Sequence, residues 1–187
     1  MTDWIFPSNP NNVFDVKGAF AHNNGFVDWT KGNTKVQKGD TVYLYASSPV
    51  KSIIAITVAV KTNLTNEDKL NEDDYWLDDV KKEKSKKSYA IRLKLIQFLS
   101  GKEFSYDELQ NHGLNSNIQS KIKANKELAL YLEDSVSNFK KSFEWIDFHE
   151  ELSKSFLKYK DNREEFYKLV KDSFEIEGFD NPFDDKL

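Results

Sequence analysis

Five short apolar runs, each bounded by turn-forming or charged residues, occupy the first hundred positions of the chain. They are rich in β-branched and aromatic side chains and cover residues 4–6, 26–29, 41–45, 52–60 and 89–98. Runs of this length and composition predict strands rather than helices. Ser47-Ser48-Pro49 separates the third run from the fourth and favours a turn, so we expect these two runs to pair as neighbouring strands.

Helical spacing interrupts this strand pattern at three places. Residues 11–21 follow Pro10 and carry apolar side chains three to four positions apart. Ser105-Tyr-Asp-Glu has the pattern of a capping box and predicts a helix that ends at His112-Gly113, and residues 125–132 are a weaker helical candidate. This order of elements predicts a mixed α+β, barrel-like domain rather than a doubly wound sheet.

The character of the chain changes near residue 140. Beyond it, one helical face carries Trp145, Phe148, Leu152, Phe156 and Leu157, and a second helix follows Asp161-Asn162. Two short helices cannot bury a full core alone. We therefore expect a domain over residues 1–140 and a two-helix segment over 141–187 that either docks on it or begins another module.

Charge is distributed unevenly between these two parts. Residues 1–140 hold 19 Lys and Arg against 18 Asp and Glu, a net of +1, whereas residues 141–187 hold 8 against 13, a net of −5. A near-neutral domain argues against sequence-blind coating of DNA. It still contains one basic patch, formed by Lys81, Lys82, Lys84, Lys86 and Lys87. This patch fits either contact with phosphates or a solvated loop or helix end.

The sequence offers little for catalysis. Cysteine is absent, which excludes disulfides, thiolate metal sites and cysteine nucleophiles. The three histidines, His22, His112 and His149, are scattered, and no phosphate-binding loop, dinucleotide fingerprint or nucleophile elbow occurs. The paired acids Asp73-Asp74 and Asp78-Asp79 lie in what reads as a solvated loop. We expect no catalytic residue, metal or cofactor, although spacing alone leaves a two-metal nuclease open.

No part of the sequence reads as a signal peptide or a membrane span. The first ten residues lack a basic region followed by an apolar one, and no later stretch approaches the roughly 18 apolar residues that a membrane helix needs. We therefore expect a soluble, cytoplasmic protein without a membrane partner.

Tryptophans provide the best evidence for binding. Trp29 and Trp76 stand beside polar residues rather than inside apolar runs, where large rings either clamp a flat ligand or plug the ends of a barrel. Stacking of a nucleic-acid base on one aromatic ring contributes roughly 1–3 kcal/mol, enough to hold a base that has left its helix. Trp4 alternates with Phe6 on a predicted strand, which favours core packing.

Several segments resemble, in order, the EVE domain, a member of the PUA and YTH superfamily. They are Trp4-Ile-Phe-Pro-Ser-Asn-Pro, Val27-Asp-Trp, Val36-Gln-Lys-Gly-Asp-Thr-Val-Tyr-Leu-Tyr-Ala-Ser-Ser-Pro, residues 54–60, Arg92-Leu-Lys-Leu, residues 109–114 and Ile118-Gln119. The resemblance covers about residues 1–135. It implies a PUA/EVE/YTH-like mixed β pseudo-barrel with surrounding helices, whose aromatic pocket reads a modified base flipped from DNA or presented by RNA.

Carried over residue by residue, the resemblance implies a set of base-binding side chains. Trp29 and Trp76 would be the two walls of the pocket. Polar contacts to the base edge would come from Tyr45, Ser47, Ser48 and Asn9. The basic patch, rather than the resemblance, leads us to expect that Lys81, Lys82 and Lys84 touch phosphates. Ser47 and Ser48 also fit a turn ahead of Pro49, and Asn9 also fits a cap for the following helix.

The tail is similar to a different protein class. Glu144-Trp-Ile-Asp-Phe-His-Glu-Glu-Leu, residues 157–166 and Asp180-Asn-Pro-Phe resemble the helical segment that precedes the motor in McrB-type modification-dependent restriction proteins. The combined resemblance implies a reader of double-stranded DNA that carries a modified base such as 5-methylcytosine or N6-methyladenine. Residues 141–187 would then contact a motor or nuclease subunit. A reader of modified RNA and a protein-interaction module remain alternatives.

Overall fold

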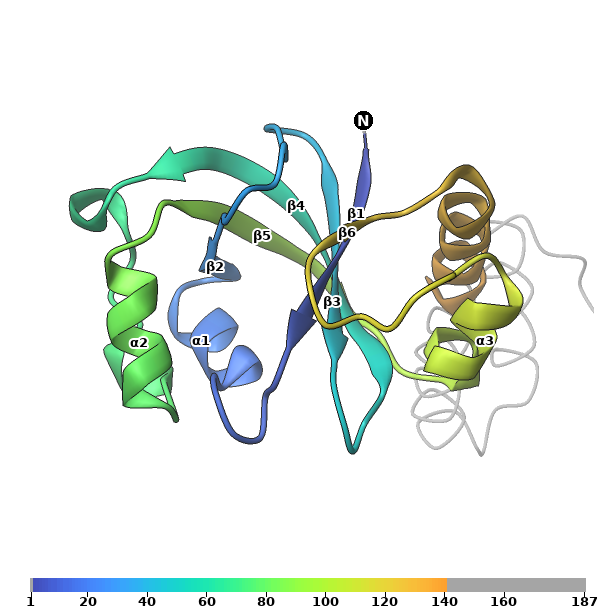
Figure 1. The fold of residues 1–187 in the computed structure, drawn as a ribbon, viewed down its shortest axis with the longest axis horizontal. Helices are drawn as coiled ribbons and strands as arrows, with labels where there is room; N and C mark the ends of the chain where they lie inside the picture. The colour runs from blue at the N-terminus through green and yellow to red at the C-terminus, as the bar shows by residue number, and fades with distance from the viewer. Residues whose placement is uncertain (1, 141–187) are drawn as a thin grey trace, which may run out of the picture. The chain divides into compact units, whose positions relative to one another are not determined.

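A computed structural model of the chain describes residues 2–140 (Figure 1). The predictions for residues 141–187, including the two helices, His149 and the proposed partner contact, lie outside the described residues. The described chain runs through β1 (Asp3–Ser8), α1 (Val16–His22), β2 (Phe26–Thr30), β3 (Thr41–Ala46) and β4 (Ser52–Leu64). It continues through α2 (Asp79–Lys86), β5 (Ala90–Phe98), α3 (Tyr106–Asn111) and β6 (Ile122–Lys123), and residues 126–140 are helical.

The strands form a single mixed sheet in the order β2-β5-β4-β3-β1-β6. β1 runs parallel to β3, and every other pairing in the sheet is antiparallel. Along β4, several register shifts interrupt its pairing with β5, and such irregularities increase the local bend of a strand. Figure 1 shows the resulting long, curved β4 and β5 beside the helices. The predicted mixed α+β architecture is confirmed.

All five predicted strands are present, and the third and fourth pair as neighbours. Two helices also agree closely with the sequence. Ser105 caps α3 by accepting a hydrogen bond from the Glu108 backbone N–H, and the helix ends at His112. Asn125 accepts one from the Leu128 N–H at the start of the last described helix. Residues up to Val136 form one compact unit.

The sequence interpretation was wrong in two helical regions. α1 begins only at Val16, because Asp15 caps it through the Gly18 N–H and residues 11–13 form a turn. The segment read as a solvated loop contains a short 3-10 helix, Asp73–Tyr75, and then α2, which Asp78 caps through the Lys81 N–H. Tyr75 and Trp76 of this segment pack against the core instead of standing free in solvent.

The sheet has two differently covered faces. On one face, Val42 and Leu44 of β3 pack with Phe20 of α1 in the main hydrophobic cluster. Successive side chains of a strand point to opposite faces, so Tyr43 and Tyr45 belong to the other face. There Tyr45 lies against Tyr106 of α3, with ring centroids 6.4 Å apart. Among residues 2–140, no helix combines the length and apolarity needed to cross a bilayer.

Candidate functional site

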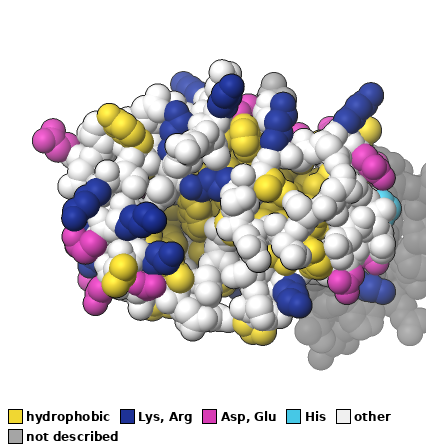
Figure 2. All heavy atoms as spheres, viewed as in Figure 1, with side chains coloured by type: hydrophobic (Ala, Val, Ile, Leu, Met, Phe, Trp, Pro, Cys, Tyr) yellow, Lys and Arg dark blue, Asp and Glu magenta, His cyan; other side chains and the backbone are white. Residues whose placement is uncertain are grey.

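A cavity of about 890 Å³ opens beside the face of the sheet that α1 covers. Its walls come from the end of β1, the end of β2 with the loop over residues 31–35, Trp76, helix α2 and residues 119–121. Figure 2 shows basic side chains around an apolar recess on this side of the molecule. A volume of this size lies within the range of pockets that bind small molecules or single building blocks of larger ones.

Aromatic rings form the apolar wall of this cavity. Phe14 touches both tryptophans: its ring centroid lies 5.9 Å from that of Trp29 in an edge-on arrangement and 4.9 Å from that of Trp76. Two backbone hydrogen bonds, Leu77 N–H to the Val13 carbonyl at 2.9 Å and Asp15 N–H to the Tyr75 carbonyl at 2.8 Å, hold the Trp76 segment in place. Tryptophans far apart in sequence therefore reach one cavity by packing on the same phenylalanine.

Trp4 also lines the cavity, and its indole is fixed by Asp40. The Trp4 Nε1–H donates to Asp40 Oδ2 at 3.2 Å, and the same carboxylate accepts the backbone N–H groups of Thr2 and Gln37. Burial opposes ionisation of Asp40, but these hydrogen bonds outweigh it and lower the pKa of the carboxyl group. Trp4 thus packs against the core, as predicted, and contributes to the cavity wall as well.

The polar lining of the cavity is strongly cationic. It contains five lysines, Lys31, Lys35, Lys81, Lys84 and Lys121, and one carboxylate, Asp28. That carboxylate is already engaged by Arg92. Within residues 2–140, the ammonium groups of Lys81 and Lys84 form neither an ion pair nor a hydrogen bond. The lining is therefore suited to an anionic or acceptor-rich ligand.

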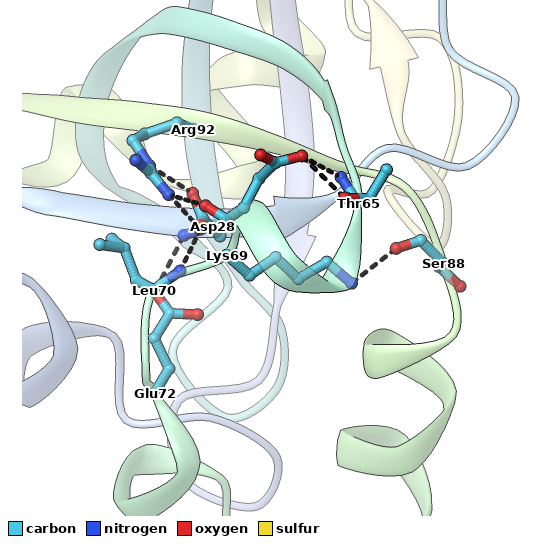
Figure 3. A network of polar contacts seen from close by, with 8 residues as sticks. Asp28, Thr65, Lys69, Leu70, Glu72, Ser88 and Arg92 are labelled. Carbon is cyan, nitrogen blue, oxygen red and sulfur yellow. Dashed lines mark hydrogen bonds and ion pairs between the residues drawn. The ribbon is translucent and has the colours of Figure 1, made fainter.

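A second, smaller cavity of about 100 Å³ contains a very different polar cluster (Figure 3). Arg92 binds Asp28 in bidentate fashion, with Nε 2.9 Å from Oδ1 and Nη2 2.8 Å from Oδ2. The Leu70 N–H donates to Asp28 Oδ2 at 2.7 Å, and the Asp28 N–H donates to Glu72 Oε1 at 2.9 Å. The cluster ties β2 to β5 and to the loop after β4, and so fixes the backbone next to Trp29.

Burial shifts the pKa values of two ionisable groups in this cluster. Burial raises the pKa of Glu72 to about 8, although the hydrogen bond from Asp28 acts in the opposite direction. Lys69 donates to the carbonyls of Ser85, Lys86 and Ser88 at 2.6–3.0 Å, at the C-terminal end of α2. A cation in this position stabilises the helix end. Burial lowers the pKa of Lys69.

Six of the predicted site residues line the large cavity together: Trp29, Trp76, Asn9, Ser47, Lys81 and Lys84. Two of them also have local structural contacts. Asn9 Oδ1 accepts the N–H of Asn12 at 3.2 Å in the turn before α1, and Ser47 Oγ donates to the Ser8 carbonyl at 2.9 Å. The structure therefore brings both the tryptophans and the lysines to one place, whatever their role in binding.

Three other predicted site residues lie elsewhere. Tyr45 is buried on the opposite face of the sheet, where burial raises the pKa of its hydroxyl group, so it forms no slot with Trp29. Ser48 is exposed in the turn between β3 and β4. Lys82 points toward Asp73 and lines the second cavity. Its Nζ donates a hydrogen bond to the Asp73 backbone carbonyl at 3.1 Å.

Lys121 and Phe14 are cavity residues that the sequence did not single out for the site. Phe14 was read as part of a helix that actually starts later, and nothing in the sequence near Lys121 distinguishes it from other lysines. Of the described histidines, His22 ends α1 and His112 stacks on Tyr131 with ring centroids 3.8 Å apart. Residues 2–140 contain no cluster of three His, Asp or Glu side chains placed to hold a metal ion.

Comparisons with known proteins define the class of fold. No family model and no curated protein matches the chain. Two mutant forms of ZmASCH from Zymomonas mobilis have similar structures, at 13% and 12% identity with TM-scores of 0.52 and 0.51. They cover 72% and 71% of this chain and 98% and 95% of their own. A protein from Rhodopseudomonas palustris, Rpa0253, is 14% identical with a TM-score of 0.49.

At this level of identity the likeness establishes the fold alone. ASCH domains are PUA-like, so the described part of the chain has a PUA-like fold, as the sequence resemblance implied.

Proposed function

We propose that residues 1–140 bind nucleic acid and take one base into the large cavity between Trp29 and Trp76. The observation that carries this proposal is the combination of lining groups: three tryptophans and a phenylalanine form the apolar wall, and five lysines border it. Flat rings favour a planar heterocycle, and the unpaired ammonium groups of Lys81 and Lys84 favour its phosphates. Neither class of side chain alone would distinguish a nucleotide from other ligands.

The preferred target is a modified base flipped out of duplex DNA. Flipping costs a few kcal/mol, which stacking on one or two aromatic rings compensates. Lys81 and Lys84 lie on α2 at the border of the cavity and would hold the phosphates beside the flipped nucleotide. The choice of a modified base, and a role as the specificity part of a restriction system in which residues 141–187 contact a motor or nuclease subunit, rest on the sequence resemblance.

Fluorescence anisotropy with labelled duplexes that differ by one methyl group tests this proposal. The full chain should bind the duplex with a central 5-methylcytosine or N6-methyladenine more tightly than its unmodified counterpart. Trp29→Ala should lower the affinity for the preferred duplex about 5- to 150-fold, because stacking on one ring contributes about 1–3 kcal/mol. The control is Tyr89→Ala, which removes an exposed aromatic ring that does not line the cavity.

Three results would contradict the proposal in different ways. Equal affinity for modified and plain duplexes would remove the modified-base reader. Equal effects of Trp29→Ala and Tyr89→Ala would remove the cavity as the binding site. Tighter binding of an RNA strand carrying the same base would move the target to RNA, since a contact with the 2′-hydroxyl distinguishes the two sugars.

A further inference from the structure

Lys121 occupies an unusual position among the lysines of the cavity. It immediately precedes β6, is only partly exposed and lines the cavity wall. Its Nζ lies 5.3 Å from the centroid of the Phe6 ring, and Phe6 is itself fully buried. A Cβ placed on Gly32, in the loop that follows β2, would be 3.6 Å from the same Nζ. The ammonium group thus lies between the core and the loop that continues from Trp29.

The donors of Lys121 are not used by the described part of the protein. Across residues 2–140, its ammonium group has no carboxylate partner and no hydrogen-bond acceptor, and it lies over the Phe6 ring. Burial lowers the pKa of the lysine because desolvation disfavours its charged form. A partly buried cation without compensating hydrogen bonds reduces the stability of the unliganded fold.

Lys69 is a lysine with a structural role in this protein, and it provides a comparison for Lys121. It is also partly buried, but its Nζ donates to three backbone carbonyls. Lys121 has the same three donors, finds no acceptor for them among residues 2–140, and lines the wall of the cavity. Acceptors for these donors therefore have to come from whatever enters the cavity.

We infer that Lys121 donates a hydrogen bond to a carbonyl oxygen of the base in the cavity, which makes it a specificity-determining residue. The inference rests on the proposed function. An ammonium group donates and accepts nothing, so it favours bases with an exocyclic carbonyl, namely cytosine, thymine, guanine and their methylated forms. Adenine and N6-methyladenine have no carbonyl; on both edges that a protein commonly reads, their acceptor is a ring nitrogen next to the amino donor.

The depth of Lys121 in the cavity favours a contact with the base over a contact with phosphate. Lys81 and Lys84 are exposed at the border of the cavity, where the nucleic-acid backbone would pass. Lys121 instead lies close to Phe6 at the core. A phosphate at this position would lose its hydration shell and lie against the aromatic ring of Phe6, which is unfavourable. A carbonyl group on a stacked base reaches the same position as part of the base.

The experiment compares Lys121→Met with Lys123→Met in the full chain. Both variants remove one positive charge from neighbouring positions, but Lys123 is exposed and does not line the cavity. Anisotropy titrations use three labelled duplexes at one salt concentration, with 5-methylcytosine, N6-methyladenine or an abasic site at the same central position. Thermal unfolding of both variants checks that they are folded, and Lys121→Arg tests whether a donor at this position is sufficient.

The wild-type chain should bind the 5-methylcytosine duplex more tightly than the other two. Lys121→Met should lower that affinity about 10- to 100-fold, the usual range for a hydrogen bond to a charged group, and affect the abasic duplex no more than Lys123→Met does. Lys121→Arg should retain the preference for 5-methylcytosine. The wild-type comparison needs no variant, so the inference stays testable if a substitution unfolds the chain.

Several results would overturn the inference. One is that the wild-type chain binds the N6-methyladenine duplex as tightly as the 5-methylcytosine duplex. Another is that Lys121→Met and Lys123→Met have equal effects on affinity. A third is that Lys121→Met lowers the affinity for the abasic duplex as much as that for the 5-methylcytosine duplex, which indicates a phosphate contact. If binding nevertheless depends on Trp29, the proposed function stands and only the role of Lys121 falls. If no duplex binds in a Trp29-dependent way, both proposals fall.

Discussion

Helix α2 presents lysines with opposite surroundings on its two sides. Lys82 and Lys86 face Asp73, with Nζ atoms 3.5 and 3.0 Å from its Oδ2, and both line the small cavity. Lys81 and Lys84 line the large cavity, and the described residues give neither ammonium group a partner. One short helix thus separates lysines that are paired with Asp73 from lysines whose ammonium groups have no partner among residues 2–140.

The contrast extends beyond the helix to the two cavities. Trp76 lines both of them. On one side, Asp28, Arg92 and Glu72 satisfy one another and leave little for a ligand. On the other, the lining is cationic and aromatic with a single carboxylate that is already paired. We expect unsatisfied charge, rather than charge itself, to distinguish a binding surface from a structural one, and four experiments test that distinction.

The largest effect is expected from Arg92→Met. The substitution leaves the Asp28 side chain, which is 1% exposed, without its bidentate partner. Breaking a buried ion pair by removing one member costs about 3–5 kcal/mol, so the free energy of unfolding should fall by that amount in urea denaturation. Lys94→Met, at an exposed position on the same strand, is the control. A loss below about 1 kcal/mol would mean that the cluster is not structural.

A pH-dependent effect should follow from Glu72. Its pKa is about 8 in the folded protein against an ordinary value of 4.5, so folding favours its protonated form. The resulting stabilisation is complete below about pH 4.5 and is lost as the pH rises through about 8.

Glu72→Gln removes this titration while its amide oxygen still accepts the Asp28 N–H. In urea unfolding from pH 5 to 8.5, the variant should gain stability relative to the wild type by roughly 2–4 kcal/mol as the pH rises. Parallel pH profiles for the two proteins would contradict this expectation.

The two sides of α2 can be compared directly in nucleic-acid binding. Lys81→Gln/Lys84→Gln should weaken binding of a duplex and lower the slope of log K against log salt by about 1.8, or about 0.9 for each lost phosphate contact. Lys82→Gln/Lys86→Gln removes the same charge from the same helix and should leave the slope nearly unchanged. Equal changes for the two double variants would show that only net charge matters.

The smallest effect is expected from Asp73→Asn. Its carboxylate is about half exposed, and hydrogen bonding to Lys86 lowers its pKa. Exposed ion pairs contribute about 0–1 kcal/mol, so the loss of stability should stay below about 1 kcal/mol and should shrink further at high salt. A larger, salt-independent loss in thermal or urea unfolding would mean that this side of α2 depends on Asp73 more than its exposure suggests.

The sequence predicted the sheet better than the site. The β-branched and aromatic runs are strong local signals, whereas β6 has only two residues and owes its existence to β1. Helix α2 gave no amphipathic signal, because none of its residues is buried. Its first turn is capped by Asp78 and its last carbonyls accept hydrogen bonds from Lys69, and periodicity reports neither contact.

The site residues divide for a related reason. Trp29 and Trp76 were singled out because each stands among polar neighbours, and both line the cavity. Alternation along β3 separates Tyr45 from Leu44 but does not say which face of the sheet carries the cavity. Lys121 gave no local signal, since its setting depends on Phe6 and Gly32, both far away in the chain. Local patterns identify candidate side chains, and tertiary packing decides which of them meet.

The strand order also has a consequence for how this chain is synthesised. β1 lies between β3 and β6, so it is synthesised before the other strands of this sheet but gains its second neighbour only after Ile122 has been translated. A fragment that stops earlier exposes one border of β1, an open template for association with other chains. Expression boundaries for this domain should therefore lie beyond residue 123, and a truncated product should be recovered mainly in inclusion bodies.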